Sequence, residues 1–160
     1  MTEALITYSD STIIDAPADK VYAVITDITN MGKFSPECKE CYWESDNHSV
    51  GGWLVGKNIT PERTWETRSL VTKATENQEF TFTTGGDRVE WSYKLSQEND
   101  QTLLTETWTV FPPFKDYFLE RYGPDTDVEE ILKGRLQTTK AGIKETLSNI
   151  KTYIESDKSN

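Results

Sequence analysis

The residues of this sequence best suited to chemistry are a carboxylic acid, Glu106, and a phenol, Tyr93. Glu106 falls in the run 102–111, where side chains alternate between the two faces of a predicted strand. It shares its face with Trp108 and other apolar residues, so it is the single acid on an otherwise apolar face. An unpaired carboxylate in such surroundings is costly, and it would take up a proton or acquire a cationic partner.

Two interpretations of Glu106 stay open at this point. In the first, Glu106 is a hydrogen-bonding anchor for a ligand or a general acid/base with a raised pKa, and Tyr93 is a second catalytic candidate. In the second, Glu106 belongs to a buried bridge with Arg63, Arg68 or a tryptophan N–H, and its role is structural.

A wider set of residues is predicted to line a ligand pocket. If the strands curl around a helix, their apolar faces turn inward and bring together indole and phenol groups whose polar edges need partners. The alternative for each single aromatic residue is ordinary core packing. The predicted ligand-binding residues are Trp65, Phe80, Phe82, Trp91, Tyr93, Glu106, Trp108, Asn58, Arg68 and Phe114.

Metal and nucleophilic chemistry find little support in the sequence. The single histidine, His48, lies in a polar turn, so neither a His–carboxylate metal cluster nor a Ser-His-Asp set can be assembled elsewhere. Cys38 and Cys41 lie three positions apart, and in an extended segment such side chains point to opposite faces. We therefore predict no metal site and no cofactor, and we interpret both cysteines as packing or surface residues. Proton-transfer chemistry, such as cyclisation or dehydration of a reactive ketone chain, remains feasible.

Charge and length narrow the classes of partner. The 160-residue sequence has 27 acidic and 17 basic residues, a net charge of -10, which disfavours nucleic acid and anionic membrane surfaces as partners. No leader-like segment or bilayer-spanning run is seen, so we expect a cytoplasmic location without membrane insertion. We expect a single domain over residues 1–160, as a monomer or a homodimer.

Hydrophobic periodicity predicts the elements that position these residues. Residues 5–14 read as a strand, and two short helices follow between Pro17 and Pro36. Residues 38–111 show short alternating runs separated by turns such as Gly85-Gly86-Asp87, which is typical of an antiparallel meander. The facing of the strands within 53–74 is left open.

The last third of the sequence contains an aromatic segment and a long amphipathic helix. We predict that residues 111–122 form a loop with a single helical turn, which acts as a gate, a hydrophobic plug or a dimer contact. Residues 126–129 fit a capping box, and apolar residues recur at helical spacing from there to Ile154. This helix is long enough to cross a whole sheet.

Several motifs resemble the START/Bet v 1-like (SRPBCC) superfamily, and within it the polyketide cyclase/dehydrase-like group. They are Asp27 together with IDAPADKVY (14–22), MGKFSPE (31–37), GKN (56–58), WET (65–67), WSY (91–93) and TETW (105–108). The resemblance implies an α+β helix-grip fold. In this fold a curved antiparallel sheet of six to seven strands wraps around a long C-terminal helix, and two short helices follow strand one.

The same resemblance implies binding of a small hydrophobic or aromatic molecule, lipid-like or polyketide-like, in a cavity between sheet and helix. One scaffold hosts lipid carriers, ligand-binding proteins, aromatic cyclases and stress-response proteins in this superfamily, so the fold alone does not decide whether the protein is an enzyme. An aromatic polyketide cyclase or dehydratase and a non-catalytic partner-binding module are the alternatives.

Overall fold

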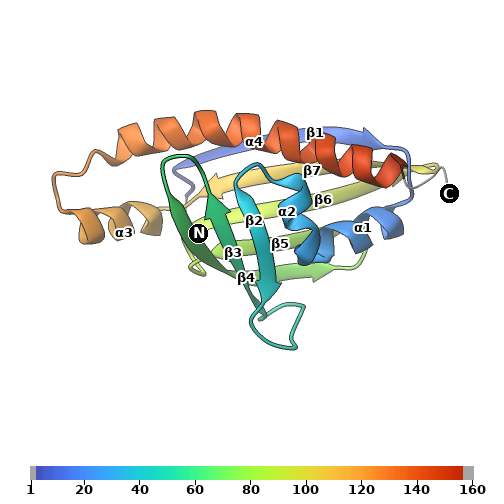
Figure 1. Ribbon diagram of the computed structural model, residues 1–160, viewed down its shortest axis with the longest axis horizontal. Helices are drawn as coiled ribbons and strands as arrows, with labels where there is room; N and C mark the ends of the chain where they lie inside the picture. Colours follow the sequence, from blue (N-terminus) through green and yellow to red (C-terminus); the bar gives the residue numbers. More distant parts are fainter. Residues whose placement is uncertain (1–2, 157–160) are drawn as a thin grey trace.

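The structure, a computed structural model, describes residues 3–156 and forms a curved seven-stranded antiparallel sheet packed against a long helix (Figure 1). This confirms the predicted α+β helix-grip architecture. The strands are β1 (Ile6–Ile14), β2 (Cys38–Trp43), β3 (Trp53–Ile59), β4 (Thr64–Thr75), β5 (Glu79–Thr84), β6 (Val89–Glu98) and β7 (Gln101–Val110). The helices are α1 (Ala18–Thr26), the short 3-10 helix η1 (Ile28–Asn30), α2 (Met31–Phe34), α3 (Pro113–Tyr122) and α4 (Val128–Ser156).

The strand order β1-β7-β6-β5-β4-β3-β2 is a meander to which one strand distant in sequence, β1, is added at the β7 end. From β2 to β7 each strand pairs with its sequence neighbour, whereas β1 pairs with β7 at the far end of the meander. Residues with positive φ make the tight connections: Asn77 between β4 and β5, Gly85 and Gly86 between β5 and β6, and Asn99 between β6 and β7. The predicted glycine turn is therefore confirmed, because glycine and asparagine adopt this conformation at little cost.

Helix α4 begins one residue later than the predicted capping box. The Asp127 carboxylate accepts the N–H of Glu130 at 3.1 Å, which makes Asp127 the N-cap. The Thr126 hydroxyl instead donates to the carbonyl of Gly123 at 2.7 Å. An acid at the cap and a glutamate three residues later still give the reciprocal spacing of a capping box, shifted by one position.

Burial along α4 is uneven. Its second half buries five side chains against the sheet and the early helices: Ile143, Thr146, Leu147, Ile150 and Ile154. Its first half buries only Val128. Although α4 is long, no helix within residues 3–156 is apolar enough to cross a membrane.

The two ends of the sheet are covered differently (Figure 1). Helices α1 and α2 lie near the C-terminal end of α4, and α3 lies at the opposite end of the molecule. Helix α2 approaches β2 so closely that a Cβ at Gly32 would stand 2.2 Å from the carbonyl oxygen of Lys39. Only glycine permits that approach, so Gly32 helps to set the close packing at the α1–α2 end.

Helix α3 corrects the prediction of a loop with a single helical turn over residues 111–122. Pro113 stands in the first turn of this ten-residue helix, where its missing N–H costs no hydrogen bond. The aromatic residues then fall four apart on one face, with ring centroids 4.5 Å apart for Phe114–Phe118 and 5.5 Å for Phe118–Tyr122. The proline pair starts this helix and does not prevent it.

Candidate functional site

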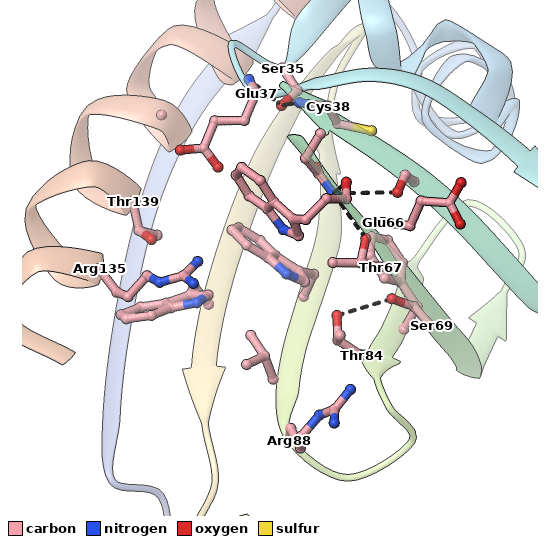
Figure 2. A pocket seen from close by; sticks show the side chains of 18 of the residues that line it. Ser35, Glu37, Cys38, Glu66, Thr67, Ser69, Thr84, Arg88, Arg135 and Thr139 are labelled. Carbon is pink, nitrogen blue, oxygen red and sulfur yellow. Dashed lines mark hydrogen bonds between the residues drawn. The ribbon is translucent and has the colours of Figure 1, made fainter. Parts of the chain in front are cut away.

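A pocket of about 750 Å³ lies between the inner face of the sheet and α4, with α3 at its side. This volume falls within the roughly 300–1,000 Å³ that is usual for small-molecule sites. Phe82, Trp91 and Trp108 form its aromatic wall on the sheet side. Arg135 and Thr139 reach toward it from α4 (Figure 2).

The register of the central strands brings the predicted site residues together. Tyr93 on β6 is directly opposite Glu106 on β7, and Trp91 is opposite Trp108. Phe82 on β5 is opposite Trp91 in turn. Directly opposed residues in an antiparallel pair share a face, so the alternation seen in the sequence places all five on the inner side.

Glu106 is buried beside Tyr93, and each is only 3% exposed. The Tyr93 hydroxyl donates to Glu106 Oε2 at 3.0 Å, and Oε1 has no hydrogen-bond partner among residues 3–156. Burial raises the pKa of Glu106 to about 8, and the hydrogen bond from Tyr93 only partly opposes this. Burial, followed by the negative charge of an ionised Glu106, also raises the pKa of Tyr93 well above its ordinary value. Both groups are therefore mostly protonated at neutral pH.

The sequence-based alternative of a buried ion pair at Glu106 is wrong. Arg68 pairs with Glu44 at the outer edge of the sheet, and its guanidinium lies 3.8 Å from the ring centroid of Trp53. Arg63 lies over Trp65 at 4.0 Å. Among residues 3–156, Glu106 therefore has a phenol as its partner and no cation, so no positive charge offsets the burial that raises its pKa.

Most of the other predicted ligand-binding residues also line the pocket. Trp65, Arg68 and Asn58 border it from β3 and β4, and Phe114 borders it from α3. The Asn58 side-chain amide is already used within the protein, because its Nδ2 donates to the carbonyls of Gly56 and Trp65 at 3.3 Å each.

Phe80 is the exception among the predicted ligand-binding residues. It is fully buried and does not border the pocket. Its ring packs against Trp43 and Phe82 at centroid distances of 6.5 and 5.7 Å. The structure therefore gives Phe80 the core-packing role that was the alternative for each aromatic residue.

The two cysteines depart from the sequence-based geometry. A β-bulge between Cys38 and Glu40 inserts an extra residue, so Cys38 faces Asn58 and Cys41 faces Gly56 across the sheet. Both thiols consequently point to the same side and border the pocket. The Cys38 thiol donates to the carbonyl of Glu40 at 3.5 Å. Interaction with the neighbouring Cys41 thiol lowers the pKa of Cys38, and interaction with Cys38 together with burial raises the pKa of Cys41.

The prediction that these thiols point apart is wrong, because a bulge reverses the alternation of a strand. Both cysteines are free thiols. Within residues 3–156 no group of three or more histidine, cysteine, aspartate or glutamate side chains is placed to hold a metal ion.

Sequence reasoning missed several charged residues of the pocket. Arg88, Arg121, Arg135 and Glu37 border it, each from a different segment of the chain. They stand at turns or on solvent-facing helix positions in the sequence, where charged side chains are ordinary. Only their residue type, arginine in place of lysine, could have drawn attention to three of them.

The family assignment follows from comparison with known proteins. The family model described as "Polyketide cyclase / dehydrase and lipid transport" matches residues 6–155. The chain belongs to this family. A polyketide cyclase-like protein from Corynebacterium glutamicum, Cgl2372, is 40% identical, with 98% of this chain and 95% of that chain covered and a TM-score of 0.68.

More distant solved structures share the fold. The di-domain aromatase/cyclase StfQ from the steffimycin biosynthetic pathway has a TM-score of 0.75 at 13% identity, and the match covers 98% of this chain and 53% of StfQ. Ara h 8.0201 has a TM-score of 0.62 at 13% identity, covering 94% of this chain and 98% of that one. At such identities the likeness concerns the fold alone. A comparison with curated proteins finds no match.

Proposed function

We propose that this protein binds a small hydrophobic or aromatic molecule, lipid-like or polyketide-like, in the pocket between the sheet and α4. The observation that supports this most is a pocket of about 750 Å³ whose sheet-side wall carries Phe82, Trp91 and Trp108. Apolar ligands gain roughly 25 cal/mol per Å² of apolar surface removed from water, and aromatic walls offer large areas for that burial. Membership of a family described by polyketide and lipid chemistry points the same way.

Binding can be measured by tryptophan fluorescence, because Trp91 and Trp108 border the pocket and Trp43 does not. We expect a lipid and aromatic-polyketide panel to contain members that quench or shift the emission on titration. The signal should shrink in Trp91→Phe and persist in the matched control Trp43→Phe. Absence of any saturable change across the panel would remove the proposal.

A second candidate function is aromatic cyclisation or dehydration, and the pair Glu106 and Tyr93 favours it. A carboxyl group with a pKa of about 8 holds its proton at neutral pH and can still give it up. In a dehydration, Glu106 would protonate the departing hydroxyl, which leaves as water, and the resulting carboxylate would then take the proton from the neighbouring carbon as the double bond forms. Tyr93 would hold the carboxyl group in position through its hydrogen bond to Oε2.

The catalytic candidate is tested with Glu106→Gln, which keeps the shape of the side chain and removes the acid. We expect the variant to fold and to bind the ligand, with turnover reduced by about 10²–10⁴, the usual contribution of a positioned acid or base. Glu90→Gln is the matched control, since Glu90 alternates with Trp91 on β6 and faces the outer side. Full activity of Glu106→Gln on a verified substrate would exclude Glu106 from the mechanism and leave the binding function in place.

A further inference from the structure

The arginines of this acidic protein are gathered around the pocket. The sequence contains five arginines, and all five border the pocket. None of the lysines that the structure describes does so. Although the chain has a net charge of -10, the cationic side chains that border the pocket are therefore all arginines.

The five arginines come from five different elements. Arg63 lies in the β3–β4 turn, Arg68 on β4, Arg88 in the β5–β6 turn, Arg121 on α3 and Arg135 on α4. Figure 2 shows Arg88 near the hairpin end of the sheet and Arg135 on the helix beside the pocket. Only the folded chain brings these guanidinium groups to one rim, so a local sequence bias does not explain the cluster.

Four of these guanidinium groups have no carboxylate within salt-bridge distance in the part of the chain that the structure describes. Arg68 alone forms an ion pair, with Glu44. Arg63 lies over the Trp65 ring and Arg88 over the Tyr117 ring, each 4.0 Å from the ring centroid. A guanidinium stacked by its face on an aromatic ring keeps its N–H groups at the edge, where they can donate to an anion in a fork.

Arg135, on α4, is a partly desolvated cation of this rim. It is half-buried, and burial lowers its pKa, as does the positive charge of the nearby Arg63. The negative charge of Glu37 opposes this lowering of the Arg135 pKa, but among residues 3–156 Glu37 and Arg135 do not form an ion pair. Two neighbouring cations, one of them partly desolvated, are stabilised when an anion is placed between or beside them.

Acidic residues do not cancel this positive charge. Besides the buried Glu106, the carboxylates on the pocket lining are Glu37 and Glu66. In Figure 2, Glu66 points away from the pocket interior and Glu37 points toward α4. Because Arg68 is already paired with Glu44, four guanidinium groups remain beside Glu37 and Glu66. The local field therefore attracts anions although the whole protein repels them.

We propose that the ligand is an amphipathic acid, with an apolar or aromatic body against Trp91 and Trp108 and a carboxylate held at the pocket rim by Arg135 with Arg63 beside it. This inference rests on the proposed binding function and adds the charge of the ligand to it. The arginine rim also selects against neutral lipids of the same size, because they leave Arg135 without a partner after its remaining water is displaced.

The experiment compares 1-pyrenebutyric acid with its methyl ester, which lacks the negative charge and carries one more methyl group. Both are titrated at neutral pH and low salt and followed by pyrene fluorescence. We expect the acid to bind about tenfold more tightly than the ester, in keeping with the strength of charge-assisted hydrogen bonds. Arg135→Gln should lose most of that difference and keep its affinity for the ester within about twofold. Lys133→Gln removes the same charge from the same helix at an exposed position away from the pocket, and it should change neither affinity.

Each outcome separates this inference from the proposed function. Equal affinity for acid and ester, or preference for the ester, overturns the acidic ligand and leaves the hydrophobic pocket standing. Failure of both probes to bind removes the inference together with the pyrene-sized apolar site it depends on. If Arg135→Gln does not fold, Arg63→Gln at an exposed position provides the same test, and an undiminished preference for the acid in that variant overturns the assignment of the rim.

Discussion

The two halves of α4 face different surroundings. Residues 147–156, with α1, form a packed half in which Leu147, Ile150 and Ile154 close against the sheet away from the pocket. Residues 128–146, with α3, form a pocket half in which Arg135, Thr139 and Ile143 border the pocket. One continuous helix thus provides core contacts at one end and a pocket wall at the other. The difference teaches that the packed contacts of this fold are concentrated away from the pocket, so the pocket can hold groups whose burial lowers the stability of the protein.

The largest expected effect concerns Glu106, a pocket-lining residue on β7 whose burial lowers the stability of the protein. Its pKa is about 8 in the folded protein and near 4.5 when the chain is unfolded. Between these values the folded state holds a proton that the unfolded state releases, so the free energy of unfolding should fall as pH rises from about 4.5 to about 8. Each pH unit contributes about 1.4 kcal/mol, up to roughly 5 kcal/mol in total.

The measurement is urea unfolding of the wild type and of Glu106→Gln at intervals between pH 5 and pH 9. The stability difference between the two proteins should shift in favour of Glu106→Gln as pH rises, and it should level off above about pH 8. A difference that stays constant over this range would mean that Glu106 titrates normally and that the pocket carries no such cost.

A second comparison uses two phenylalanines on the same face of β5, one in each environment. Phe80 is fully buried outside the pocket, and Phe82 borders the pocket. We expect Phe80→Ala to lower the free energy of unfolding by about 3–5 kcal/mol, because it leaves a cavity in a packed core. Phe82→Ala should cost less, about 1–3 kcal/mol, since one side of that ring already lacks packed neighbours. Urea unfolding measures both, and equal costs would contradict the division into a packed half and a pocket half.

The smallest effect is expected at the start of the pocket half. Asp127 caps α4 by accepting the N–H of Glu130. Its replacement by alanine should lower stability by about 1 kcal/mol, the usual value for an N-cap. Asp125→Ala removes the same charge two residues earlier, where the structure shows no capping hydrogen bond, and it serves as the control in thermal unfolding. A larger loss in the control than in Asp127→Ala would place the helix start elsewhere.

Much of the fold could be predicted from the sequence because its signals are local. Alternation within β6 and β7 gave the inward face that Trp91, Tyr93, Glu106 and Trp108 share, since side chains in a strand alternate with a period of two. Helical spacing likewise predicted α4 to within about two residues at each end, which is the ordinary uncertainty of helix boundaries.

The departures from prediction arise where non-local or irregular geometry decides. The bulge in β2 depends on how that strand pairs with β3, and it turned Cys38 and Cys41 to one side against the expected alternation. The partner of Glu106 depended on which side chains reach it across the sheet, and Tyr93 did so in place of an arginine. The arginine rim was not visible at all, because its members meet only after five elements have folded.

The pairing of β1 with β7 has a consequence for how the chain is made. Thr7 and Thr109 hydrogen-bond across this junction although 102 positions separate them in the sequence. At the usual pace of the ribosome, about 5–20 residues per second, the first strand waits roughly 5–20 s for its neighbour to be synthesised. During that interval the threonine- and isoleucine-rich β1 has no partner strand, and its backbone hydrogen-bonding groups are exposed. The nascent polypeptide is therefore most vulnerable to misassociation before translation reaches residue 110.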